Sequence, residues 1–152
     1  MDNAEQIEYW NGDAGKRWAK DDEIMARLLR PVTEALLDHA NLEECRSALD
    51  VGCGGGSQSL QLARRLGEGS RVMGVDISAP MLAVAQDKAT SPAQGRAALQ
   101  FLLADAATHE FPRANFDLLF SRFGVMFFAD PEAAFTNMRT ALKSQGRLAF
   151  SC

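Results

Sequence analysis

The sequence predicts an α/β fold with an open, doubly wound parallel sheet. A short apolar stretch at residues 48–51 runs directly into a glycine-rich loop, and apolar residues at helical spacing follow that loop. Helical patterns separate most of the further strand-like stretches, which are 71–76, 99–103, 116–121 and 147–151. Alternation of strands and helices is typical of parallel sheets. With 152 residues, the chain has room for one domain.

The bulk composition argues against several function classes. The net charge is −4 and no Lys/Arg cluster forms a basic stripe, which argues against a nucleic-acid partner. No apolar run is long enough to span a membrane, and the acidic, polar N-terminus is unlike a signal peptide. Three cysteines, Cys45, Cys53 and Cys152, are odd in number and lack metal-ligand spacing. We therefore expect no metal site and a reduced, cytoplasmic protein.

The N-terminal segment is rich in aromatic residues. It holds both tryptophans of the chain, Trp10 and Trp18, and the only tyrosine, interleaved with glycines and charged residues. Two interpretations fit this pattern: a hydrophobic tether that packs the N-terminus onto the domain, or a lid that closes over a ligand. Residues 22–39 follow with apolar residues at helical spacing, and Pro31 predicts a kink or two short helices that meet there.

The glycine loop is the first motif that carries chemistry, and it reads Asp50-Val51-Gly52-Cys53-Gly54-Gly55-Gly56-Ser57. Glycines let the backbone turn sharply and let a ligand approach closely, and the helix that follows presents free backbone N–H groups. This context is typical of nucleotide-like ligand sites, although an ordinary tight turn has similar glycines. Ser57 stands where the dinucleotide fingerprint has a glycine, and we expect it to cap the helix.

Acidic residues follow the second and third predicted strands. Asp76 lies about twenty residues beyond the glycine loop, where a carboxylate can accept both hydroxyls of a ribose. Its alternative role is a helix-start carboxylate that interacts with the helix dipole, and Ser78 is the expected cap of that helix. Asp105 comes just past the third strand, either as a ligand contact or as a plain loop residue.

Aromatic and sulfur side chains gather after the fourth strand, where the run 122–128 contains Phe123, Met126 and Phe127. Ligands bind at the carboxyl edge of open α/β sheets, so these residues are candidate substrate contacts. Packing beneath the next helix is the alternative, and we expect part of the cluster to do this. His39 and His109 are weak candidates for a general base, so no catalytic residue is assigned.

The series of motifs resembles class I S-adenosylmethionine (SAM) methyltransferases, and it is similar to their ubiquinone/menaquinone-biosynthesis-like branch with type 11/25 domains. The resemblance covers residues 9–151 and rests on DVGCGGG, VMGVDISAPM, LLADA, FDLLFSRFGVMFF and SQGRLAF. It implies a Rossmann-like sheet of strand order 3-2-1-4-5. It also implies an N-terminal lid and helices over residues 1–40 and a core over residues 46–152.

The resemblance also implies roles for individual residues, with SAM as cofactor and S-adenosylhomocysteine (SAH) as product. The methionine part would lie beside Gly52, Gly54, Ser121 and Arg122, with its amino group oriented by Asp50. Asp76 would bind the ribose hydroxyls. The adenine would contact Ile77, Asp105 and Ala106. Trp10 and Trp18 would belong to the cover of the site, and the acceptor would face Phe123, Met126 and Phe127.

One feature departs from this family. Its members continue past the fifth strand with a helix and an antiparallel strand pair, whereas this sequence ends at Cys152. The fifth strand would then be a sheet edge that carries Leu148 and Phe150, and exposed edges invite pairing with another chain. We therefore expect a homodimer or a swapped assembly that covers this edge.

The favoured function is SAM-dependent methyl transfer to a small, apolar or aromatic acceptor. The sulfonium already activates the methyl group, so the protein needs only to align the nucleophile behind it. A second hypothesis is a truncated, non-catalytic module that binds SAM or acts by association, motivated by the early end of the sequence. A third is a nicotinamide-dependent reductase, which Ser57 and Asp105 disfavour.

Overall fold

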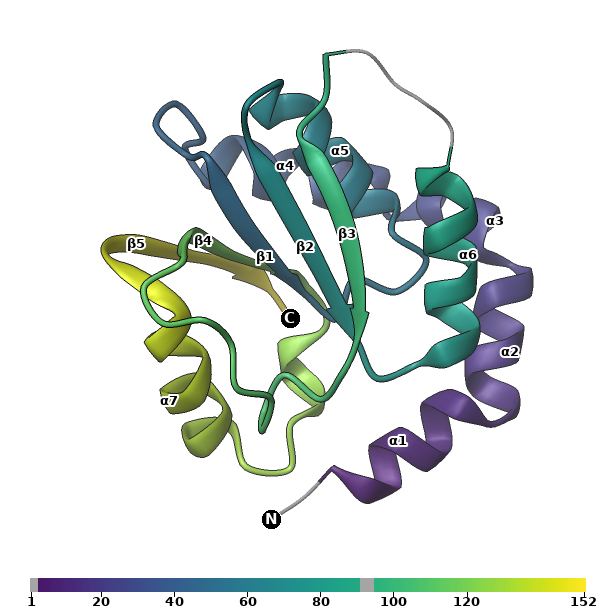
Figure 1. Cartoon of the computed structure of the whole chain (residues 1–152). Helices are drawn as coiled ribbons and strands as arrows, with labels where there is room; N and C mark the ends of the chain where they lie inside the picture. The colour runs from purple at the N-terminus through teal and green to yellow at the C-terminus, as the bar shows by residue number, and fades with distance from the viewer. Residues whose placement is uncertain (1–2, 91–94) are drawn as a thin grey trace.

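The computed structural model describes residues 3–90 and 95–152, in which a five-stranded sheet carries helices on both faces (Figure 1). The strand order is β3-β2-β1-β4-β5, and every neighbouring pair is parallel. The strands are β1 Ser47–Val51, β2 Arg71–Asp76, β3 Ala98–Leu103, β4 Phe116–Arg122 and β5 Leu142–Ser151. The fold class and the strand order predicted from the sequence are confirmed.

The helices precede the sheet and connect its strands. In the described residues they are α1 Ala4–Asn11, α2 Asp13–Lys20, α3 Asp22–Leu28, α4 Arg30–His39, α5 Ser57–Leu66, α6 Ala79–Ala89, the 3-10 turn η1 Val125–Phe127 and α7 Pro131–Ala141. α3 ends at Leu28 and α4 starts at Arg30 with Pro31 in its first turn, so the two-helix interpretation of residues 22–39 is correct.

Each face of the sheet packs a separate apolar core. Ala48 of β1 and Leu118 of β4 face the core under α4 and α5, whereas their chain neighbours Leu49 and Leu119 face the core under α7. Successive residues of a strand point to opposite faces, so strands covered on both sides read as continuous apolar runs. This explains the continuous apolar runs in the middle of these strands, Ala48–Leu49 in β1 and Leu118–Phe120 in β4. Polar side chains that can reach a ligand, such as Asp76 and Arg122, therefore lie at the carboxyl ends of the strands.

The first three helices, α1, α2 and α3, pack outside the two cores of the sheet. α1 and α2 are joined at Gly12, and α2 packs against α6 (Figure 1). A Cβ on Gly15 would lie 1.8 Å from the carbonyl oxygen of Trp10, so this position must be glycine for α1 and α2 to approach as they do. These helices stand at the edge of the sheet where β1, β2 and β3 end.

Local structure differs from the sequence prediction at the start of two helices and at β5. Gly56, with φ of 77°, takes the N-cap position of α5, so the prediction of Ser57 as the cap is wrong. Ser78 does hold the N-cap position of α6, but its hydroxyl donates to the carbonyl of Trp10 instead of capping the helix. β5 pairs with β4 at Leu142 and then again from Arg147 onward, with an irregular register between.

Candidate functional site

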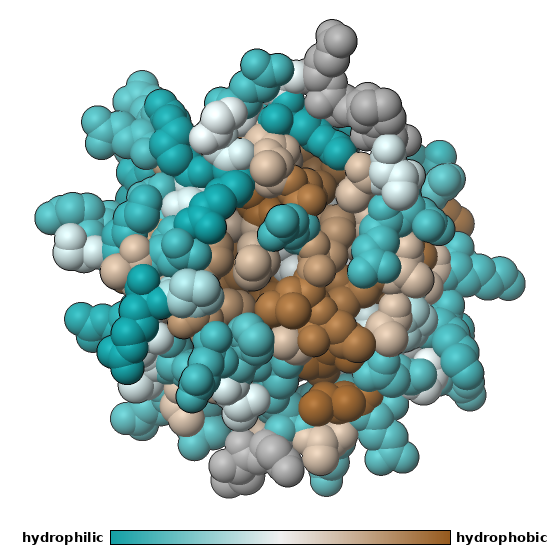
Figure 2. Space-filling model, viewed as in Figure 1, coloured by the Kyte–Doolittle hydropathy of each residue, from teal (hydrophilic) through white to brown (hydrophobic). Residues whose placement is uncertain are grey.

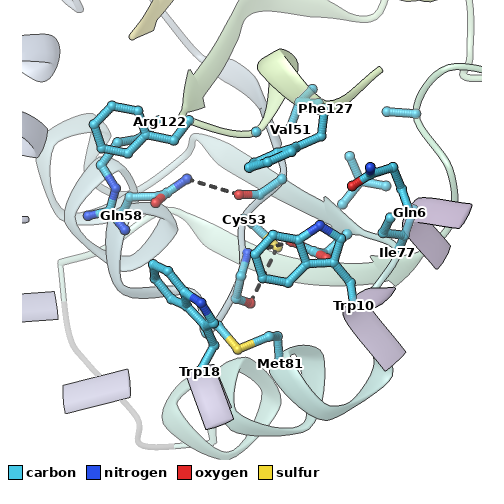
Figure 3. A pocket seen from close by; sticks show the side chains of 18 of the residues that line it. Gln6, Trp10, Trp18, Val51, Cys53, Gln58, Ile77, Met81, Arg122 and Phe127 are labelled. Carbon is cyan, nitrogen blue, oxygen red and sulfur yellow. Dashed lines mark hydrogen bonds between the residues drawn. The ribbon is translucent and has the colours of Figure 1, made fainter. Parts of the chain in front are cut away.

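A pocket lies at the carboxyl ends of β1, β2, β3 and β4, beneath the N-terminal helices (Figure 3). The residues that follow the four strands supply its floor, and α1, α2 and α3 supply its cover. Its lining holds predicted site residues from α1, from α2 and from the ends of the four strands: Gly52, Gly54, Asp76, Ile77, Asp105, Ala106, Arg122, Phe123, Phe127, Trp10 and Trp18. Four separate stretches of sequence are thus brought together at the sheet edge where open α/β folds bind ligands.

The glycine loop has the backbone conformation that only glycine adopts readily. Gly52, Gly54 and Gly56 have φ values of 67°, 54° and 77°. A Cβ on Gly52 would lie 2.5 Å from the Cα of Gly124, so the loop after β1 and the loop after β4 touch through their backbones. Gly52 and Gly54 line the floor of the pocket, and Gly124 has a part in this contact that the sequence did not indicate.

Asp76 stands between the glycine loop and α6. One carboxylate oxygen accepts from the N–H of Gly54 at 2.7 Å, and the other accepts from the N–H of Ser78 at 2.8 Å. Burial raises the pKa of Asp76, and these backbone N–H groups act in the opposite direction. Each carboxylate oxygen has two acceptor sites, so both oxygens can still accept from hydroxyl groups of a ligand.

Asp105 links the loop after β3 to the beginning of the chain. Its Oδ1 accepts from the N–H of Ala107 at 2.9 Å and from Nδ2 of Asn3 at 3.0 Å. Oδ1 of Asn3 in turn accepts from the N–H of Ala129 at 2.8 Å. Ala106 is buried beside Asp105 and also lines the pocket. Asn3 thus ties the N-terminal cover to two loops at the pocket rim.

The two tryptophans lie together over the pocket (Figure 3). The ring centroids of Trp10 and Trp18 are 6.0 Å apart, and those of Trp10 and Phe127 are 5.5 Å apart. Nδ2 of Asn11 donates to the carbonyl of Ile77 at 2.8 Å, which anchors the end of α1 above β2. The aromatic segment is therefore packed onto the domain and covers the pocket, and its closing over a ligand stays a prediction.

A lysine from α6 connects the cover to the glycine loop. Nζ of Lys88 donates to the carbonyl of Gly55 at 3.0 Å and to Oγ of Ser57 at 2.8 Å. It also forms an ion pair with Asp22 at the start of α3, a residue that is only 7% exposed. The glycine loop, α3 and α6 are thus held by one ammonium group.

Three predicted site residues do not line the pocket. Asp50 is fully buried, and it accepts from Nε2 of Gln58 at 3.0 Å and from the hydroxyl of Ser59. Burial raises its pKa to about 6. Ser121 is buried, donates to the carbonyl of Val51 at 2.7 Å and accepts from the N–H of Gly124. Met126 is 56% exposed, outside the lining. Asp50 and Ser121 therefore orient pocket groups from behind.

Several lining residues were not predicted from the sequence. Gln58 lies behind the glycine loop and holds Asp50, while the apolar part of the cover includes Met25 and Leu29. Asp22 resembles an ordinary acidic residue at a helix start, so no local signal distinguishes it.

Phe123, which was predicted, has a φ of 64°, which is strained for an aromatic residue, and such strain concentrates at functional sites.

The side chains around the pocket limit which acid–base and metal chemistry the site can support. His109 packs its ring against Phe111, and no histidine or lysine lines the pocket among the residues the structure describes. Within residues 3–90 and 95–152, no group of three or more His, Cys, Asp or Glu side chains is placed to hold a metal ion. In the same ranges, none of the helices has the length and apolar character needed to cross a membrane.

Comparison with known proteins identifies relatives along most of the chain. Nocamycin O-methyltransferase of Saccharothrix syringae is 31% identical over 127 residues, which are 84% of this chain and 45% of that protein. Demethylmenaquinone methyltransferase of Thermus thermophilus is 40% identical over 100 residues, which are 66% of this chain and 44% of that protein. The chain thus spans only part of the length of its curated relatives, from 23% of phosphoethanolamine N-methyltransferase 1 of Arabidopsis thaliana to 58% of the aklanonic acid methyltransferase DauC of a Streptomyces strain.

Solved structures agree with these relatives. Phosphoethanolamine N-methyltransferase 2 of Haemonchus contortus, in complex with S-adenosyl-L-methionine, has a TM-score of 0.71 at 30% identity. The match covers 79% of this chain and 27% of that one. The [4+2]-cyclase SpnF has a TM-score of 0.69 at 26% identity, with 79% of this chain and 43% of that one covered. The methyltransferase domain family matches residues 49–150, and the chain belongs to this family.

Proposed function

We propose that the pocket binds SAM and that the protein transfers its methyl group to a small, apolar or aromatic acceptor. The observation that carries this proposal is the convergence of the glycine loop, Asp76 and Asp105 in one pocket under Trp10 and Trp18. A related solved methyltransferase is described with S-adenosyl-L-methionine bound, which supports the same cofactor here.

In this proposal the cofactor lies across the ends of the strands. Asp76 accepts the ribose hydroxyls, and Ile77 packs on the adenine, whose edge contacts Asp105 and Ala106. Gly52 and Gly54 pass beside the methionine part, where a side chain would block close approach. Asp50 contributes indirectly, because it holds Gln58, which lines the pocket.

The chemistry demands little from the protein beyond alignment. The sulfonium is already a good leaving group, so catalysis consists of holding the nucleophile in line with the methyl group and excluding water. An acidic phenol or a carbon acid can react without a strong general base. This fits a lining that, in the described residues, offers carboxylates and aromatic rings but no histidine or lysine.

The acceptor side is apolar. Phe123, Phe127 and Phe128 line the pocket, and Met126 is exposed in the same turn as Phe127. Figure 2 shows apolar side chains gathered near the middle of the face seen in Figure 1, framed by polar ones. The named relatives act on different molecules, including nocamycin-type, quinone and phosphoethanolamine substrates by their names, so the acceptor follows from the lining alone.

An acceptor panel tests the catalytic part. The purified chain is incubated with SAM and phenols, quinone precursors, carbon acids and amines, and SAH formation is measured. Methyl transfer to an apolar or aromatic member is the expected result. SAM binding without turnover on any acceptor would favour the second candidate, a non-catalytic module that binds SAM.

Two further expectations belong to this proposal. A second copy of the chain is the expected partner at the edge strand β5, where Leu148 and Phe150 are 44% and 42% exposed. A reduced, cytoplasmic location fits the three cysteines, which are all free thiols.

A further inference from the structure

We propose that Lys88 is a positioning residue that connects α3 of the cover to the glycine loop, and that the breaking of this connection limits how fast the cofactor enters and leaves the pocket. The inference rests on the proposed function, since these rates concern SAM and SAH in the same pocket. It gives a role to a residue that lies outside the lining and that the sequence did not single out.

The first step is that one polar contact holds α3 in place. Asp22 is the only buried residue of α3, whereas Ile24 and Leu28 of the same helix are 51% and 66% exposed. Among the described residues, the ion pair of Asp22 with Lys88 is also the only side-chain hydrogen bond that joins α3 to another element. An element with few buried apolar contacts opens at a low cost in free energy, so α3 is the part of the cover that opens most easily.

The second step is that this contact needs both charges. The side chain of Asp22 is only 9% exposed, and a buried carboxylate without a cation is costly. Asp22 can therefore remain against the glycine loop only while Lys88 neutralises it. α1 is held differently, because Asn11 donates to the carbonyl of Ile77 and accepts from the N–H of Ala79. Loss of the ammonium group should thus release α3 and leave α1 in place.

The third step is that the same ammonium group holds the glycine loop. An ammonium has three N–H donors, and the two that do not bond Asp22 reach the carbonyl of Gly55 at 3.0 Å and Oγ of Ser57 at 2.8 Å. Gly55 lies between two further glycines, and glycine has the most flexible backbone of all residues. Because all three donors are in use, Lys88 acts on the pocket through the loop and α3 and not through a bond to the ligand.

The fourth step is that both ends of this connection border the pocket. Asp22, Gly55 and Ser57 line it, and so do Met25 and Ala26 of α3. α3 and α6 lie side by side, joined by the ion pair (Figure 1). When α3 moves away from α6, one wall of the pocket opens and the glycine loop loses a hydrogen-bond partner in the same event. Exchange of the cofactor is therefore coupled to the breaking of the ion pair.

Stopped-flow fluorescence tests this coupling, because both tryptophans of the chain lie in the cover. The rate of SAH binding is recorded at increasing SAH concentration, so that the slope gives the association rate constant and the intercept the dissociation rate constant. Lys88→Met should raise the dissociation rate constant about 10- to 100-fold, because the unpaired carboxylate of Asp22 favours the open cover. The association rate constant should not fall. Lys88→Arg keeps a cation beside Asp22 and should recover part of the wild-type behaviour.

A double-mutant cycle separates this role from a purely structural one. If the ion pair acts as a single connection, the combined variant Asp22→Asn/Lys88→Met should release SAH no faster than Lys88→Met alone, and multiplied effects would contradict the proposal. Lys143→Met is the matched control. It breaks a pair with Asp117 where β4 and β5 begin, at the end of the sheet opposite the pocket, and should leave the dissociation rate constant within about twofold of the wild-type value.

The outcomes distinguish this inference from the proposed function. SAH binding by the wild type, together with an unchanged dissociation rate constant in Lys88→Met, would overturn the role of Lys88 and uphold the cofactor. A wild-type chain that binds no SAH would overturn the proposed function and this inference with it. If Lys88→Met does not fold, Asp22→Asn decides, since it leaves the bonds of Lys88 to Gly55 and Ser57 in place. It should release SAH about 3- to 10-fold faster than the wild type, and an unchanged rate would contradict the proposal.

Discussion

The carboxylate of Asp22 occupies the space that a side chain at Gly55 would need. A Cβ built on Gly55 would lie 1.8 Å from Oδ1 of Asp22, and the φ of Gly55 is not in the left-handed region. The glycine is therefore required for its small size and not for its backbone conformation. α3 can close over the glycine loop only because position 55 has no side chain.

This relationship predicts the effect of Gly55→Ala. The new methyl group must push Asp22 away from Lys88, which loosens α3 over the pocket. SAH binding should weaken by about tenfold, or about 1.4 kcal/mol. The measurement is calorimetric titration, with quenching of the tryptophan fluorescence as a second readout, because both tryptophans of the chain lie in the cover.

A double-mutant cycle with Asp22→Ala provides the control. Asp22→Ala removes the atoms with which the methyl group collides, so Gly55→Ala should have little further effect in that background. If Gly55→Ala weakens binding equally with and without Asp22, the methyl group acts on the ligand directly and the contact described here is not the cause.

Asp76→Asn should weaken the binding of SAH and of 5′-methylthioadenosine alike. The amide loses the negative charge, and its NH₂ group turns toward the N–H of Gly54 or of Ser78, where the carboxylate now accepts. A loss of about 10- to 100-fold is expected for both ligands, because both carry the ribose. Asp87→Asn, on the exposed side of α6, is the matched control and should leave both affinities unchanged. An unaltered affinity in Asp76→Asn would remove the ribose assignment.

Asp50 predicts a pH dependence of stability. Burial raises its pKa to about 6, so the folded protein holds this proton more tightly than the unfolded chain does. Its contribution to the free energy of unfolding is therefore present at low pH and declines as pH rises from about 4 to about 6. Over that range the wild type should lose on the order of 3 kcal/mol relative to Asp50→Asn. Urea unfolding of both proteins at several pH values measures the difference, and parallel curves would contradict the assigned pKa.

The edge strand predicts the oligomeric state. β5 pairs only with β4 in the described part of the chain, and Leu148 and Phe150 leave an apolar surface beside α7. Light scattering should find a homodimer, and Phe150→Lys should convert it to a monomer because a charge on an edge strand opposes pairing. A wild-type chain that stays monomeric at high concentration would exclude this assembly.

The strands of the sheet could be predicted because each one is marked by residues that are close together in the sequence. The runs that form β1 and β4 are apolar on both faces, and Asp76 and Asp105 follow strand ends that meet at one edge of a parallel sheet. The resemblance to a family supplied the strand order, which apolar runs alone do not contain. Gly52 and Gly54 were predicted by the same local signal, and their positive φ values confirm the conformational need for glycine.

The cover could not be predicted because its contacts join residues far apart in the sequence. Lys88 appears as an ordinary polar residue of α6, and its bonds to Asp22 and Ser57 exist only after the helices pack. Ser57 is a good capping residue, but the left-handed Gly56 takes the cap position. Met126 fitted the aromatic cluster by composition, yet the turn η1 directs it away from the pocket while Phe127 lines it.

Titration of the purified wild-type chain with SAH, SAM and NADH in a calorimeter tests the central claim most directly. Our account predicts that SAH and SAM bind one site with dissociation constants in the micromolar range and that NADH gives no heat. A chain that circular dichroism shows to be folded, yet that binds neither SAH nor SAM, would contradict the assignment of this pocket to the cofactor. Tight binding of NADH alone would replace it with a nicotinamide site.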